Sequence, residues 1–106
     1  MSKRAVVTGG GRGIGAAIVE RLRSDGFEVV PLDITAADGI VACDVRDAAG
    51  VQDAADAIGP VDVIVNNAGL WRFDALEDVS EEDFAAAIDV NLKGPFNVMQ
   101  SFGASM

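Results

Sequence analysis

Glycines dominate residues 8 to 15, which read Thr-Gly-Gly-Gly-Arg-Gly-Ile-Gly. Gly9 would let the chain turn sharply off a strand, Gly13 would let the backbone approach a diphosphate, and Gly15 would let a helix pack closely on that strand. The following helix would direct free N–H groups and the positive end of its dipole at the anion. The spacing is not a literal G-x-G-x-x-G, and an ordinary glycine-rich turn is the alternative. The position between an apolar strand and an amphipathic helix favours diphosphate binding.

Two charged residues near this loop bear on which dinucleotide it would bind. Asp33 ends an apolar run 18 residues after Gly15. A carboxylate there could accept both ribose hydroxyls of an adenosine and would repel a 2′-phosphate. Arg12 favours the opposite choice, because a guanidinium in the phosphate loop could bind that phosphate. We give Asp33 more weight and predict NAD, with NADP less favoured; a solvated turn residue is the alternative for Asp33.

Segments with the pattern of strands and helices alternate along the chain and would position these groups. We predict strands over 4–8, 27–32, 39–43 and 61–65. Helical spacing of apolar residues runs from Ile14 to Leu22, ended by Asp25-Gly26, and again over 51–58. The alternation predicts an α/β fold with a doubly wound, Rossmann-type parallel sheet, strand order 3-2-1-4, and a ligand at the carboxyl ends of the strands. An α+β domain that merely alternates is the alternative.

A long connection, 66–79, precedes two further predicted helices. Ser80 is a good N-cap for the first, because Asp83 follows three residues later in a variant of the capping box. The second would start near Pro95 and turn three apolar side chains inward: Phe96, Met99 and Phe102.

Composition limits the classes of function. The 106 residues correspond to about one domain, half of them are hydrophobic, and a net charge of −9 argues against nucleic-acid binding. Histidine is absent and Cys43 is the single cysteine, so we expect neither a metal site nor an internal disulfide. No segment has the pattern of a signal peptide or the length of a membrane span, so we expect no membrane partner and a cytoplasmic location.

Five motifs occur together in one order: Thr8-Gly9-x-x-x-Gly13-Ile14-Gly15, Asp33, Cys43-Asp44-Val45, Asn66-Asn67-Ala68-Gly69 and Asn91. In order and spacing they resemble the short-chain dehydrogenase/reductase family, over all 106 residues. The resemblance implies that 1–106 is the NAD-binding Rossmann domain of such an enzyme, incomplete at its C-terminus after about four strands. The cofactor-binding residues that it implies are Gly9, Gly11, Arg12, Gly13, Ile14, Gly15, Asp33, Asp44, Val45, Asn67, Ala68 and Gly69.

The resemblance also implies individual roles. Asp44 would accept a hydrogen bond from the adenine amino group, with Val45 against the ring, whereas the residues alone indicate a loop or an N-cap. The backbone of 66–69 would follow the ribose, although this segment alone is simply a good turn. Asn91 would hold a water in the family's proton relay; alone, it would be a helix cap or kink. Trp71 and Arg72 could border a substrate cleft or equally pack on the surface.

One departure from the family is decisive. Its chemistry needs a serine after the fifth strand and a Tyr-x-x-x-Lys beyond it, and this chain contains no tyrosine. We therefore expect the chain to carry the adenosine-diphosphate half of the site and to have no dehydrogenase activity alone. Its parent would transfer hydride between NAD and an alcohol or ketone. A nucleotide-binding module without catalysis and a structural, self-associating protein are the alternatives.

Two apolar surfaces of the chain could drive self-association. The fourth predicted strand, 61–65, would be an unpaired edge whose side chains are apolar apart from Asp62. The final predicted helix adds apolar side chains of its own. We therefore expect the chain to self-associate through both, giving a homo-oligomer, or to be marginally folded.

Overall fold

A parallel sheet forms the centre of the computed structural model, which describes residues 2–71 and 73–106. Within those residues it has four strands: β1 (Arg4–Thr8), β2 (Glu28–Asp33), β3 (Val41–Ala42) and β4 (Val63–Val65). The order is β3-β2-β1-β4, which confirms the predicted order. In the register of the sheet, Val6 lies opposite Val30 on one side and Ile64 on the other.

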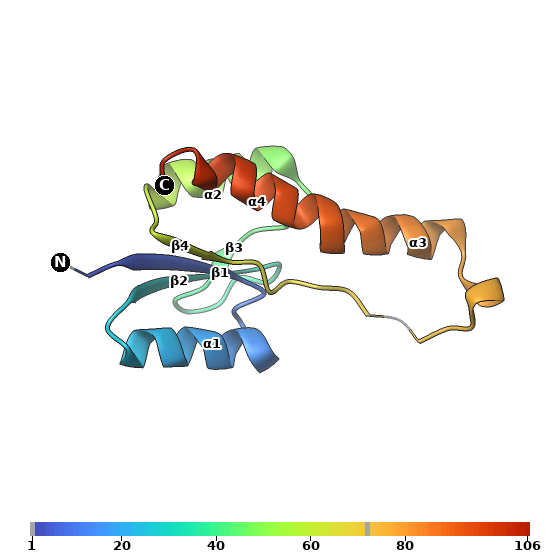
Figure 1. Cartoon of the computed structure of the whole chain (residues 1–106), viewed down its shortest axis with the longest axis horizontal. Coiled ribbons are helices and arrows are strands. Elements are labelled where there is room, and N and C mark those ends of the chain that lie inside the picture. Colours follow the sequence, from blue (N-terminus) through green and yellow to red (C-terminus); the bar gives the residue numbers. More distant parts are fainter. Residues whose placement is uncertain (1, 72) are drawn as a thin grey trace.

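Helices cover both faces of this sheet, as Figure 1 shows. Helix α1 (Gly13–Ser24) lies against one face, and α2 (Ala48–Ile58) and α4 (Gly94–Gly103) lie together against the other. Because successive strand side chains point to opposite faces, β1 supplies both cores. Ala5 and Val7 belong to the cluster under α1, and Val6 to the cluster under α2 and α4. This arrangement is the predicted doubly wound α/β fold.

Two strands are shorter than predicted. The third spans two residues rather than 39–43, because Gly39 adopts a left-handed φ of 78° and the N–H of Ile40 turns back to the carbonyl of Ala37. The fourth begins at Val63 rather than at 61, although Val61 is buried just before it.

The two helices predicted after the long connection form one nearly continuous rod (Figure 1). The first, α3 (Glu81–Ile88), begins as predicted, with the N–H of Asp83 donating to the Ser80 hydroxyl over 3.0 Å. A π-helical segment, η2 (Asp89–Lys93), joins it directly to α4. Pro95 has no N–H to donate to the turn before it, and its ring would clash with the carbonyl of residue i−4 in a regular helix. A wide π turn just before this proline accommodates both constraints.

The predicted inward face of the last helix is partly wrong. Phe102 is 1% exposed, but Phe96 is 57% and Met99 is 52% exposed. The buried face instead runs through Gly94, Val98 and Phe102, which are spaced four residues apart and so share one side of the helix. Phe96 and Met99 lie off that side.

The molecule is elongated, with principal extents of 52 × 26 × 22 Å. The length comes from residues 73–93, here called the arm, which extend beyond the sheet and contain the 3₁₀ turn η1 (Leu76–Asp78), α3 and η2 (Figure 1). Among the described residues, no helix has both the length and the apolar character that crossing a bilayer requires.

Candidate functional site

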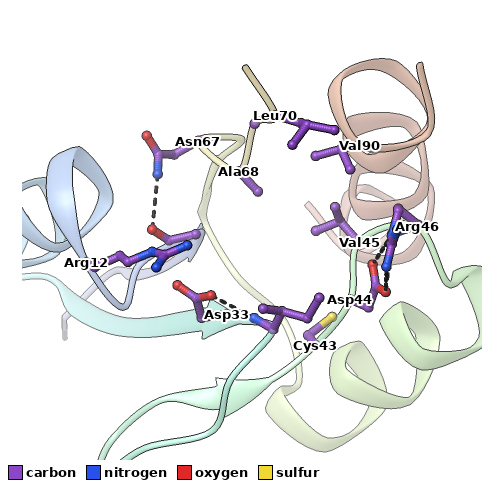
Figure 2. A pocket seen from close by; sticks show the side chains of 13 residues that line it. Arg12, Asp33, Cys43, Asp44, Val45, Arg46, Asn67, Ala68, Leu70 and Val90 are labelled. Carbon is purple, nitrogen blue, oxygen red and sulfur yellow. Dashed lines mark hydrogen bonds and ion pairs between the residues drawn. The ribbon is translucent and has the colours of Figure 1, made fainter. Parts of the chain in front are cut away.

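A cavity of about 390 Å³ opens at the carboxyl ends of the strands, where a doubly wound sheet binds ligands. Its volume is within the usual range for small-molecule sites. The walls come from four loops, one after each strand, and from the helix rod (Figure 2). The lining residues are Gly9, Arg12, Asp33, Ile34, Cys43, Asp44, Val45, Arg46, Asn67, Ala68, Gly69, Leu70 and Val90.

The loop after β1 has the backbone that its glycines predicted. Gly9 and Gly13 have φ values of 63° and 58°, in the left-handed region that only glycine adopts readily. Gly15 has a different constraint, because a Cβ there would overlap the carbonyl oxygen of Gly9 and lie 2.5 Å from Nδ2 of Asn67. That same nitrogen donates to the Gly9 carbonyl over 3.2 Å. The helix can therefore begin close to the strand only if residue 15 lacks a side chain.

Thr8 connects this loop to the turn after β4. Its buried hydroxyl oxygen accepts hydrogen bonds of 3.0 Å from the backbone N–H groups of both Asn67 and Ala68. Sequence reasoning placed Thr8 in the motif without a role of its own. Its position as the last residue of an apolar strand was the available signal, because a buried hydroxyl there needs a partner.

Asp33 occupies the end of β2 at the edge of the cavity. Its Oδ2 accepts from the N–H of Gly11 at 3.0 Å, and its Oδ1 from the N–H of Ile34 at 2.8 Å. A Cβ on Gly11 would approach Oδ2 to 2.8 Å, so glycine allows this contact. Arg12 lines the same cavity. The two side chains with opposite implications for the cofactor thus face one space (Figure 2).

The loop after β3 carries an ion pair that the sequence analysis did not identify. Arg46 donates from Nε to Oδ1 of Asp44 at 2.9 Å and from Nη2 to Oδ2 at 2.7 Å. The hydrogen bond from the Arg46 side chain is the main cause that lowers the pKa of Asp44 below its usual value. Asp44 in turn raises the pKa of Arg46, first by that hydrogen bond and then by its charge, with a smaller contribution from Asp89. A basic residue two positions after an aspartate in a turn was the available signal.

The backbone of the same loop is fixed from the helix rod. Asn97, only 3% exposed, donates from Nδ2 to the carbonyl of Val45 over 2.9 Å. A Cβ on Gly94 would meet the Val45 side chain at 2.7 Å, so α4 packs directly on this loop. Sequence reasoning missed Asn97, although a polar residue beside the apolar positions of a helix is a recognisable exception.

Cys43 is buried at the start of this loop and lines the cavity. Burial is the main cause that raises the pKa of its thiol, followed by the negative charges of Asp44 and Asp47. Because the thiolate is the reactive form, this shift lowers the reactivity of the thiol at neutral pH.

Asn91 lies in η2 and its side chain bonds to the loop after β4. The N–H of Leu70 donates to its Oδ1 at 2.8 Å, and its Nδ2 donates to the carbonyl of Leu70 at 3.0 Å. This pair ties the helix rod to the segment that follows Gly69. The water-holding role stays a prediction.

Of the thirteen predicted site residues, all of which the structure describes, eight line the cavity and five do not. Those outside the lining are Gly11, Gly13, Ile14, Gly15 and Asn91. Gly11 and Gly15 shape the loop, as described above, and Ile14 is largely exposed. The roles of all thirteen in binding stay predictions. Among the described residues, no group of three histidine, cysteine, aspartate or glutamate side chains could hold a metal ion.

Trp71 does not line this cavity. It is 80% exposed, stacks on Phe73 with ring centroids 6.2 Å apart, and borders a smaller hollow of about 230 Å³ against α3. Arg72, which was paired with it as a possible cleft residue, lies outside the described residues.

Comparison with known proteins gives consistent results. The family model described as short chain dehydrogenase matches residues 3–106. The chain is 42% identical over 114 residues to the 3-oxoacyl-[acyl-carrier-protein] reductase MabA of Mycobacterium tuberculosis, covering 100% of this chain and 46% of that protein. The chain spans about half the length of the curated relatives it matches.

Solved structures agree. Aldohexose dehydrogenase (AldT) of Thermoplasma acidophilum superimposes with a TM-score of 0.92 at 34% identity, covering 99% of this chain and 44% of that one. A short chain dehydrogenase from Burkholderia cenocepacia J2315, in complex with NADP, gives 0.88 at 33% identity, covering 98% and 51%.

Proposed function

Since the chain belongs to the short-chain dehydrogenase family of oxidoreductases, we propose that its cavity binds the adenosine-diphosphate half of a nicotinamide dinucleotide. The observation that carries the proposal is a convergence. The glycine loop, the carboxylate ending β2 and the loop containing Asp44 all open on one cavity at the carboxyl ends of parallel strands. Each of these features alone has an ordinary structural explanation. Their meeting at one place matches what a dinucleotide requires.

The residues present fit the group in charge as well as in space. The diphosphate would lie at the loop that contains Gly9 and Arg12. The first turn of α1, which the structure describes in full, contains no acidic residue that would repel it. Arg12 would add a positive charge. Asp33 would accept from the ribose hydroxyls, and Asp44 with Val45 would contact the adenine. The bound cofactor would supply the hydride chemistry, and the protein its orientation.

For the whole protein we propose hydride transfer between the cofactor and a small alcohol or ketone. The relatives support this class through a 3-oxoacyl-[acyl-carrier-protein] reductase and an aldohexose dehydrogenase. Their differing substrates give no single substrate to carry over. Asn91 would take part in the proton relay of that reaction. A module without catalysis, the alternative, receives no support from these relatives.

Among nicotinamide cofactors we propose a preference for NAD. Asp33 is anchored by two backbone N–H groups, so its carboxylate cannot easily withdraw from a 2′-phosphate. Like charges brought together in this way cost several kcal/mol, of which Arg12 would offset a part. The Burkholderia relative in complex with NADP makes the question a real one for this family.

Calorimetric titration of the chain with NADH, NADPH and ADP-ribose tests both the proposed binding site and the proposed preference for NAD. We expect all three to bind, with NADH tighter than NADPH by about tenfold. Asp33→Ala should bring the two affinities together, and Arg12→Ala should widen the difference. Asp25→Ala is the matched control, because it removes a carboxylate paired with Arg21 far from the cavity. Absence of ADP-ribose binding would refute the site. Equal or tighter NADPH binding would refute only the preference.

A further inference from the structure

Arg46 grips the carboxylate that the proposed function assigns to adenine. Besides the two side-chain hydrogen bonds to Asp44, the backbone N–H of Arg46 donates to Oδ1 at 3.0 Å. The pair is half-exposed, with side-chain exposures of 45% for Arg46 and 33% for Asp44. Both residues line the cavity, and Figure 2 shows the guanidinium closing over the carboxylate beside the helix rod.

The hydrogen bonds from Arg46 limit the number of acceptor sites that the Asp44 carboxylate can offer to a ligand. A carboxylate offers about four lone-pair sites, two on each oxygen. Oδ1 already accepts from the backbone N–H and from Nε of Arg46. Oδ2 accepts from Nη2 at 2.7 Å and also from Nε at 3.2 Å, but Nε has a single hydrogen, and Oδ1 accepts it over the shorter distance of 2.9 Å. With that hydrogen assigned to Oδ1, one acceptor site remains for a ligand, and it lies on Oδ2.

The rest of the loop is already held, so the Asp44 side chain is the part whose orientation Arg46 decides. The Asn97 amide fixes the carbonyl of Val45, and the N–H of Asp47 donates to the carbonyl of Asp44 at 3.0 Å. Without the guanidinium, only the backbone N–H of residue 46 would still donate to the carboxylate, and Oδ2 could turn toward solvent and accept water.

We propose that Arg46 is a positioning residue: it presents the one free acceptor site of Asp44 to the 6-amino group of a purine. The cavity would thereby select adenine nucleotides over hypoxanthine nucleotides. This inference rests on the proposed function. Hypoxanthine has a carbonyl oxygen where adenine has its amino group, and an oxygen facing a carboxylate is repelled. An exposed ion pair that only stabilised the fold would be worth little and would not distinguish the two bases.

The test compares ADP-ribose with its hypoxanthine counterpart, inosine diphosphoribose, by calorimetric titration of the chain. The wild type should favour ADP-ribose by at least about tenfold, the range for a hydrogen bond to a charged group. Arg46→Ala should reduce that ratio about threefold to tenfold, because the carboxylate must then be ordered on binding. Arg46→Lys should rescue the ratio only in part, since an ammonium cannot grip both oxygens.

Two controls separate positioning from a general effect. Arg21→Ala removes a similar ion pair, with Asp25, outside the cavity and should leave the ratio unchanged. In an Asp44→Ala background the ratio should be low, and adding Arg46→Ala should not change it further, because Arg46 acts through that carboxylate.

The other outcomes distinguish failure of this inference from failure of the proposed function. A wild-type ratio that survives Arg46→Ala would overturn the inference, as would an equal loss of affinity for both ligands. If the wild type bound neither ligand, the proposed function itself would fail, and the inference with it. Binding of both ligands at equal affinity would leave the site standing and remove the selection by base.

Discussion

The sheet with its covering helices and the arm contain similar apolar side chains but bury them very differently. Ala5, Val6 and Val7 of β1 are completely buried, because helices cover both faces of the sheet. In the arm, Phe73 and Leu76 are 92% and 89% exposed, and Phe84 and Leu92 are mostly exposed. A helix or strand pattern thus tells where an apolar face is, whereas burial depends on a second element that the pattern does not contain.

The largest expected effect contrasts two phenylalanines on one helix. Phe102→Ala should lower the free energy of unfolding by about 3–5 kcal/mol, because it removes a fully buried ring between α4 and the sheet. Phe96→Ala removes the same ring from a mostly exposed position and should cost less than about 1 kcal/mol. Urea denaturation measures both. Equal losses would show that Phe96 is buried in solution and that the contrast is wrong.

The glycine loop provides the next largest effect. Gly15→Ala should destabilise the chain by about 3 kcal/mol or more, because the new methyl group would overlap the carbonyl of Gly9. Gly103→Ala is the matched control, since no atom lies within 4 Å of a Cβ there among those described. It should change the unfolding free energy by no more than about 1 kcal/mol. A Gly15→Ala variant with normal stability would mean that α1 can shift away from the loop.

The sheet and its ligand edge were largely predictable from sequence, because their signals are local. Alternating strand and helix patterns gave the strand order, and the end of β2 located Asp33 beside the glycine loop. The ion pair between Asp44 and Arg46 was missed because its geometry is not determined locally. A lone charged pair two residues apart has no fixed geometry until the loop is held from another element. Asn97 provides that hold from 52 residues away in sequence.

In the arm only the start of α3 was predictable, from the local cap at Ser80. Its fusion with α4 was not, because Gly94-Pro95 normally indicates a break between helices. The π turn of η2 absorbs the proline instead. The burial of Phe102 and the exposure of Phe96 were equally hidden, since both fit an apolar helical face. The buried side is the one that carries Gly94, which lies against Val45 in the loop after β3.

Self-association would bury apolar side chains that the covered sheet buries within one chain but the helix rod leaves exposed. Strand β4 is an edge of the described sheet, and the rod presents Leu92, Phe96 and Met99 to solvent. We expect sedimentation velocity to show a concentration-dependent dimer or larger species. Each such side chain can contribute roughly 1.5–3 kcal/mol if it becomes fully buried. Phe96→Glu should weaken the association, and Gln100→Glu, which adds the same charge at another exposed position of α4, should have less effect.

A monomer at all concentrations would refute this prediction. An association that Phe96→Glu leaves unchanged would instead assign it to the edge of β4.

The smallest expected effect concerns the contribution of Arg46 to stability, which we expect to be below about 1 kcal/mol because the pair is half-exposed. The pKa of Asp44 is held below its usual value of 3.8, so the folded state favours the ionised carboxylate. The stabilisation is therefore present above that usual value and is lost as the pH falls through the lower pKa of the folded state.

Unfolding free energies of the wild type and Arg46→Ala, measured at low salt from pH 7 down to pH 3, should differ by a constant amount at neutral pH and converge below about pH 4. A difference that stays constant to pH 3 would mean that Arg46 stabilises the loop by packing rather than through the charge of Asp44. In that case the carboxylate would not be aimed by its partner, and the selection by base would lose its physical cause.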